Sequence, residues 1–193
     1  MRDRVYTDAS TYPITICGVT RELTVCRISD ELSIAAFVIL GDVDMTVKSA
    51  EALLKIVPEH DIMITAESKG IPLLHEMARQ AGENEYIVAR KEQKLYMNDV
   101  FSVDVHSITT ARKQTLYLDG NDALKMKDKR VLIIDDVIST GESLRAVERL
   151  VREAGGFVEG KACILAEGEA IYRDDILFLA ELPLILNHLE TQA

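Results

Sequence analysis

The middle of the chain alternates short, wholly apolar runs with stretches in which apolar residues recur every three or four positions. Apolar runs without a polar break are typical of strands covered on both faces, as in a parallel sheet, and the three- or four-residue spacing is typical of amphipathic helices. The predicted strands are 62–66, 86–89 and 131–134, with later ones at 158–166 and 176–180. The predicted helices are 48–57, 71–81 and 143–153.

Repeated strand and helix units predict an α/β fold with a doubly wound parallel sheet and right-handed crossovers. Ligands of such sheets bind at the carboxyl ends of the strands. We therefore expect three loops, each of which follows a strand, to converge in one crevice. These loops are 67–70, 90–94 and 135–143.

Two regions depart from this alternation. Residues 1–45 contain only short β-prone pieces, at 15–19, 23–27 and 35–40, and we expect them to form a small N-terminal hood over the crevice of a core formed by 46–193. Residues 103–119 lie between two predicted sheet strands and have a polar alternating pattern. A long polar excursion of this kind is often a mobile lid, so we expect a flexible loop there.

Composition restricts the class of protein. A chain of 193 residues suits one domain with a small accessory element, and its net charge of −10 argues against nucleic acid or an anionic membrane as a partner. The cysteines and histidines are scattered without metal-ligand spacing, so neither a zinc site nor a disulfide framework is expected. They are Cys17, Cys26 and Cys163, and His60, His75, His106 and His188.

Neither a secretory signal nor a membrane span is expected. The first residues are charged at Arg2, Asp3 and Arg4, and the most apolar stretch, 176–186, is interrupted by Glu181 and Pro183. We therefore expect a cytoplasmic protein.

The strongest candidate for chemistry is the run 131–143, which joins an apolar strand to two acids and a hydroxyl-rich turn. Asp135 and Asp136 are suited to accept hydrogen bonds from a vicinal diol or to bind a hydrated Mg²⁺. The turn after them offers backbone N–H groups to an anion at the start of a helix. An ordinary helix cap uses the same residue types, so spacing alone leaves both interpretations open. The turn residues are Ser139, Thr140, Gly141, Glu142 and Ser143.

This run resembles the signature for phosphoribosyl pyrophosphate (PRPP) of the type I phosphoribosyltransferases. The resemblance implies that Asp135 and Asp136 hold the ribose hydroxyls and that residues 139–143 wrap the 5′-phosphate. Two rival phosphate-binding patterns do not occur. The chain has no GxxxxGK followed by Ser or Thr, and it has no GxGxxG after a strand.

Three further segments resemble parts of the purine enzymes of this family. The turn at 66–70 is similar to the pyrophosphate loop, and the basic run at 89–95 is similar to the segment after the next strand. Taken alone, the first is also an ordinary turn and the second a solvated face. Residues 105–115 resemble the loop that closes over PRPP. The implied pyrophosphate ligands are Ser68, Lys69, Gly70, Arg90, Lys91 and Lys94, joined from the lid by Arg112 and Lys113.

The resemblance implies a reaction in which a purine nitrogen attacks C1 of PRPP and pyrophosphate leaves with Mg²⁺, with Asp135 and Asp136 binding the metal through water. It also implies a homodimer. Residues 118–124 depart from the adenine-type pattern, so no catalytic acid is carried over from them.

The base is less well indicated. The strand at 162–166 is followed by the acidic Glu167, whose carboxylate suits the amino group of adenine. Phe37 is a candidate to stack on a purine, although a lone Phe in an apolar run is usually part of the core. A xanthine or hypoxanthine enzyme and a non-catalytic PRPP-binding regulator stay open. An orotate enzyme is disfavoured because its lysine-rich loop is missing.

Overall fold

The core of the protein is a five-stranded parallel sheet in the order β11-β10-β9-β5-β6. The computed structural model describes residues 2–105 and 114–187. The parallel arrangement that the sequence predicts is confirmed. The strands are β5 (Ile62–Ala66), β6 (Ile87–Ala89), β9 (Arg130–Ile138), β10 (Phe157–Glu167) and β11 (Leu177–Leu182).

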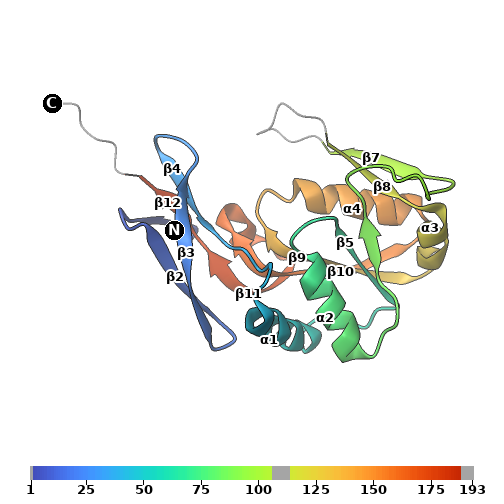
Figure 1. Cartoon of the computed structure of the whole chain (residues 1–193), viewed down its shortest axis with the longest axis horizontal. Helices are drawn as coiled ribbons and strands as arrows, with labels where there is room; N and C mark the ends of the chain where they lie inside the picture. The colour runs from blue at the N-terminus through green and yellow to red at the C-terminus, as the bar shows by residue number, and fades with distance from the viewer. Residues whose placement is uncertain (1, 106–113, 188–193) are drawn as a thin grey trace.

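Both faces of this sheet are covered, which confirms the doubly wound architecture (Figure 1). On β5, Ile62 and Ile64 face one buried cluster and Met63 faces the other. The first cluster includes residues of α3 (Gly120–Met126), α4 (Glu142–Glu153) and the hairpin of β7 (Phe101–Val105) and β8 (Gln114–Leu118); the second includes residues of α1 (Val43–Leu54) and α2 (Ile71–Ala81).

Helix boundaries follow local capping chemistry. α2 ends at Gly82, which adopts a left-handed φ of 75°, and its predicted limits are confirmed. The predicted helix 48–57 is displaced, because α1 starts at Val43 after Asp42, whose carboxylate accepts a hydrogen bond from Met45 N at 3.2 Å. Thr46 and Ser49 are buried in α1 although they are polar. The apolar spacing that predicts a helix is therefore interrupted over the first turns of α1.

The hood is a second five-stranded sheet, with strand order β1-β12-β4-β3-β2, at one end of the molecule (Figure 1). Its last strand comes from beyond residues 1–45: the chain leaves β11 in the core sheet, passes Pro183 and enters the hood as β12. The strands are β1 (Arg4–Tyr6), β2 (Thr11–Ile16), β3 (Val19–Arg27), β4 (Leu32–Ala36) and β12 (Leu184–Leu186).

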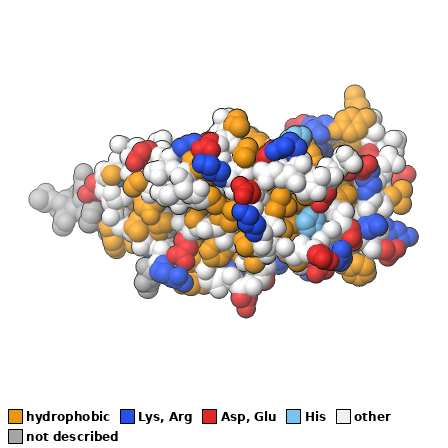
Figure 2. Space-filling model, turned by 90° about the horizontal axis from the view of Figure 1, so that it is seen from below, with side chains coloured by type: hydrophobic (Ala, Val, Ile, Leu, Met, Phe, Trp, Pro, Cys, Tyr) orange, Lys and Arg blue, Asp and Glu red, His pale blue; other side chains and the backbone are white. Residues whose placement is uncertain are grey.

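The surface carries charges of both signs. Figure 2 shows Lys and Arg side chains interspersed with Asp and Glu side chains over one face of the molecule. Among the described residues, no helix has the length and apolar character needed to cross a membrane.

Candidate functional site

Two adjacent acids lie near the carboxyl end of β9, the middle strand of the core sheet. Asp136 is only 4% exposed, and its backbone N–H donates to Asp135 Oδ1 at 2.9 Å. Burial, followed by repulsion from Asp136, raises the pKa of Asp135 to about 7. The negative charge of the two carboxylates is therefore poorly solvated. A ligand that supplies hydrogen-bond donors or positive charge would stabilise it.

The turn after β5 packs directly against this pair. Ser68 Oγ donates to Asp135 Oδ1 at 3.4 Å. A Cβ atom added to Gly70 would lie 2.9 Å from Thr65 Oγ1 and 3.1 Å from Asp135 Oδ1. The absence of a side chain at Gly70 thus lets the turn approach the acids.

Lys69 connects the same turn to the hood. Its ammonium group donates to the Phe37 carbonyl at 2.7 Å and lies 3.4 Å from Asp136 Oδ2, a buried atom with no hydrogen-bond partner among the described residues. In this structure Lys69 therefore faces Asp136 and the hood, although the sequence assigned it to pyrophosphate.

The basic segment after β6 is joined to the turn after β5 through Glu67. The Glu67 carboxylate pairs with Arg90 Nη2 at 2.9 Å and accepts from Lys91 N at 2.9 Å. The Lys91 hydrogen bond, and then Arg90, hold the pKa of Glu67 below its ordinary value. Lys94 lies 3.5 Å from Glu92. The three loops that the sequence places after strands are thus brought together.

The turn after β9 forms a small hollow of about 60 Å³, lined by Asp135 and residues 137–144. Gly141, at φ 75°, precedes the first residue of α4, and no side chain in the described part of the chain caps the helix. The cap position is thus taken by a glycine and not by a serine or threonine. Helix N–H groups without a side-chain acceptor provide an anion-binding arrangement.

The region between β4, α1 and the end of β10 supplies the remaining candidates. The Phe37 side chain is 5% exposed and belongs to the core, so it does not present a ring face for stacking. Val38 and Leu40, which alternate with buried neighbours, are 54% and 55% exposed. Glu167 is the last residue of β10. Burial raises the pKa of its carboxyl group, and the positive charge of Lys69 opposes that shift.

Several site residues differ from the sequence-based set. Arg112 and Lys113, assigned to the lid, lie outside the described residues. Glu67 was missed because an acid in a cationic loop does not suggest phosphate binding. Arg145 and Arg173 were also missed: Arg145 Nη1 donates to the Thr140 carbonyl at 3.2 Å, and the Arg173 guanidinium lies against Gly141.

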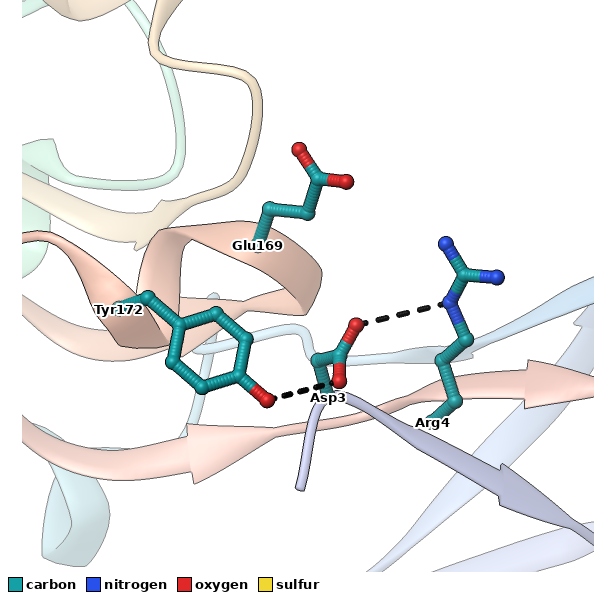
Figure 3. A pocket seen from close by; sticks show the side chains of 4 residues that line it. All are labelled: Asp3, Arg4, Glu169 and Tyr172. Carbon is teal, nitrogen blue, oxygen red and sulfur yellow. Dashed lines mark hydrogen bonds and ion pairs between the residues drawn. The ribbon is translucent and has the colours of Figure 1, made fainter. Parts of the chain in front are cut away.

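A separate open pocket of about 430 Å³ lies between β1 and the 3₁₀ turn η1 (Gly168–Tyr172). It is lined by Asp3, Arg4, Glu169 and Tyr172 (Figure 3). Its acids do not form a metal cage: the described residues contain no group of three or more His, Cys, Asp or Glu side chains that could hold a metal ion.

Comparisons with known proteins agree on one type of domain. Residues 45–181 match the family model for the phosphoribosyl transferase domain. A hypoxanthine/guanine phosphoribosyltransferase of Methanotorris igneus is 35% identical over 109 residues, which are 56% of this chain and 55% of that protein. One from Methanococcus maripaludis is 33% identical over 141 residues, 73% of this chain and 69% of that protein. The match to the first relative thus spans little more than half of its length.

Solved structures share the fold at low sequence identity. An adenine phosphoribosyltransferase from Thermoanaerobacter pseudethanolicus has a TM-score of 0.62 at 23% identity, covering 74% of this chain and 84% of that one. The Saccharomyces cerevisiae enzyme, solved with adenine and an imino-altritol bisphosphate, has a TM-score of 0.63 at 16% identity, covering 89% and 92%.

Proposed function

This chain belongs to the phosphoribosyl transferase domain family, and from that premise we propose that it transfers the 5-phosphoribosyl group of PRPP to a purine base and releases pyrophosphate. One observation carries the proposal: the uncapped start of α4 at Gly141 opens into the same hollow that Asp135 lines. A phosphate held by helix N–H groups then places a ribose next to the acids. Ser139, Thr140, Glu142 and Ser143 complete the 5′-phosphate turn.

Asp135 and Asp136 are assigned to the ribose hydroxyls. Each carboxylate oxygen accepts hydrogen bonds, and two hydroxyl donors offset the burial and the repulsion from Asp136 that raise the pKa of Asp135. Asp136 Oδ2, buried and short of a hydrogen-bond partner among the described residues, is an acceptor available to such a donor.

The same pair fits Mg²⁺. Mg²⁺ is usually bound by one or two carboxylates together with waters and substrate phosphates, and the described residues offer two acids here rather than a complete cage. Asp135 and Asp136 would hold it through water. When bound, the ion neutralises part of the charge of the departing pyrophosphate.

The pyrophosphate end is assigned to the loops that flank Asp135. Ser68 and Gly70 offer backbone N–H groups, and Lys69, Arg90, Lys91 and Lys94 bring positive charge. Because Arg90 is paired with Glu67 and Lys69 with Asp136 before a ligand arrives, both cations have to be shared with pyrophosphate or exchanged to it. The protein's part in the reaction is then positioning and electrostatic stabilisation of the leaving group.

For the base we propose adenine, with Glu167 as the acceptor for its amino group and Val38 and Leu40 as the apolar surface against the ring. A second candidate is a 6-oxopurine. Two observations favour it. The ammonium group of Lys69, which donates to the Phe37 carbonyl, is a donor suited to an exocyclic oxygen, and the relatives are hypoxanthine/guanine enzymes.

We further propose a homodimer. Leu95 is fully exposed and Tyr96 is 64% exposed, on the loop whose Arg90 donates to the Tyr96 hydroxyl at 3.1 Å. A second copy of this chain would cover these apolar side chains and enclose the pyrophosphate end.

The test is release of pyrophosphate from PRPP and Mg²⁺ in the presence of adenine, hypoxanthine, guanine, xanthine, orotate or uracil, one at a time. Release with adenine supports the proposal as stated, and release with hypoxanthine or guanine alone replaces adenine by a 6-oxopurine. Tight PRPP binding without release for any base identifies a regulator. No binding at millimolar PRPP rejects the assignment of the site.

A further inference from the structure

An arginine from a distant part of the chain lies beside the phosphate turn. Arg173 directly follows η1, more than thirty residues after Gly141 in the sequence. A methyl group added at Gly141 would overlap Arg173 Nη1, so this nitrogen fills the space that a side chain on the turn would take. The turn and the guanidinium are therefore packed against each other.

The guanidinium is fixed in a way that leaves one nitrogen available. Arg173 Nε and Nη2 donate to the two oxygens of Asp175 at 2.8 and 2.7 Å, while Nη1, the nitrogen beside Gly141, has no hydrogen-bond partner among the described residues. Asp175 is held in turn by Lys161 at 2.5 Å. A bidentate pair of this kind orients the planar group before any ligand binds.

Tyr172, the last residue of η1 and the neighbour of Arg173 in the sequence, is anchored beside the hood sheet. Tyr172 donates from its hydroxyl to Asp3 Oδ1 at 2.9 Å, and the Asp3 side chain points back toward the turn (Figure 3). Asp3 is only 5% exposed, and its carbonyl accepts from Leu184 N at 2.7 Å. The C-terminal end of η1 is thus connected through Tyr172 to Asp3, the residue before β1. The next residue, Arg173, is connected through Asp175 and Lys161 to β10.

We propose that Arg173 is a binding residue for the 5′-phosphate, with Nη1 as the donor and Asp175 as its positioning residue. The inference rests on the proposed function and extends it, because it adds a fixed cation to a turn that otherwise offers backbone N–H groups and hydroxyls. Arg145, whose Nη1 donates to the Thr140 carbonyl and also lies near Gly141, adds a second positive charge. Two cations at this turn select a doubly charged phosphate monoester over an unphosphorylated ribose.

The test separates the two ends of the site by measuring the affinities of ribose 5-phosphate and of pyrophosphate independently, by calorimetry. We expect Arg173→Gln to weaken ribose 5-phosphate roughly tenfold or more, which is the usual loss for one charge-assisted hydrogen bond, and to leave pyrophosphate within about twofold. Arg173→Lys, which keeps the charge without the fork, should recover part of the loss. Arg149→Gln is the control, since this α4 arginine is exposed and its one ion pair within the described part of the chain is with Glu153.

The outcomes are distinct. Wild-type protein that binds neither ligand removes the proposed function and this inference together. If the wild-type protein binds both ligands, two results overturn the inference and leave the proposed function in place. One is an unchanged affinity of Arg173→Gln for ribose 5-phosphate, and the other is an equal loss of affinity for both ligands. If Arg173→Gln does not fold, the exposed Arg145→Gln and the Asp175→Asn variant replace it, and unchanged ribose 5-phosphate affinity in both overturns the inference.

Discussion

The ammonium group of Lys69 lies 3.4 Å from Asp136 Oδ2, and this is the one ion pair of that buried carboxylate among the described residues. Asp136 is 4% exposed, whereas 42% of the Lys69 side chain is in solvent. The pair therefore lies at the boundary between the buried acid and the crevice, and the ligand that enters the crevice competes for the same lysine.

We predict that Lys69→Met destabilises the protein by about 1 kcal/mol at pH 8, because it leaves Asp136 unpaired while the exposure of the lysine screens the interaction. Urea unfolding measures this change. In the double variant Lys69→Met with Asp136→Asn the free energy of unfolding should return toward the wild-type value, but pyrophosphate release should not. A double variant as unstable as Lys69→Met would show that the lysine acts by other contacts.

Gly70 tests how closely the turn must approach the acids. The Gly70→Ala methyl group would contact Thr65 Oγ1 and Asp135 Oδ1, so we expect at least a tenfold rise in KM for PRPP, on the order of 1.4 kcal/mol or more. Combining it with Thr65→Ala removes the first contact and keeps the second. That double variant should stay impaired, and full recovery of the wild-type KM would mean that the contact with Asp135 is unimportant.

The elements with uninterrupted patterns were predictable to the residue, as for 62–66 and 71–81, where apolar runs and a terminal glycine define the limits. The three site loops were also predictable, because each follows a strand of one parallel sheet. Arg173 was not, since its position depends on how the chain returns from β10 to β11 and on its pairing with Asp175. Phe37 stayed a candidate for stacking beside the core interpretation, because alternation alone does not tell which of the two sets of alternating residues faces the core.

Phe37 is buried, whereas Val38 and Leu40 are exposed, so substitutions at these positions should have different effects. We predict that Phe37→Ala costs about 3–5 kcal/mol of stability, as expected for a buried aromatic. Val38→Ala and Leu40→Ala should leave stability nearly unchanged and raise KM for the base several-fold without changing KM for PRPP. Leu124→Ala, at a 70% exposed position on α3, is the control. Equal effects on both substrates would place Val38 and Leu40 outside the base pocket.

The stability of the protein should depend on pH through Asp135. Asp135 has a pKa of about 7 in the folded protein, against an ordinary value of 3.8, so the folded state holds its proton more tightly than the unfolded state. The stability that this proton contributes is fully present below the unfolded value and is lost as the pH rises through about 7. Between pH 5 and pH 8 the free energy of unfolding should therefore fall by on the order of 2 kcal/mol.

The Asp135→Asn variant removes this titration, so its stability should change less over the same range, while Asp8→Asn, at an exposed position, should behave as wild type. PRPP with Mg²⁺ favours the ionised pair, and its binding at pH 6.5 should release protons, measured by calorimetry in buffers of different ionisation enthalpy. Proton uptake, or an equal pH dependence in Asp135→Asn, would show that the acids are not ionised by the ligand. Asp135 would then bind the ribose as a neutral acid, and the metal would have to be held elsewhere.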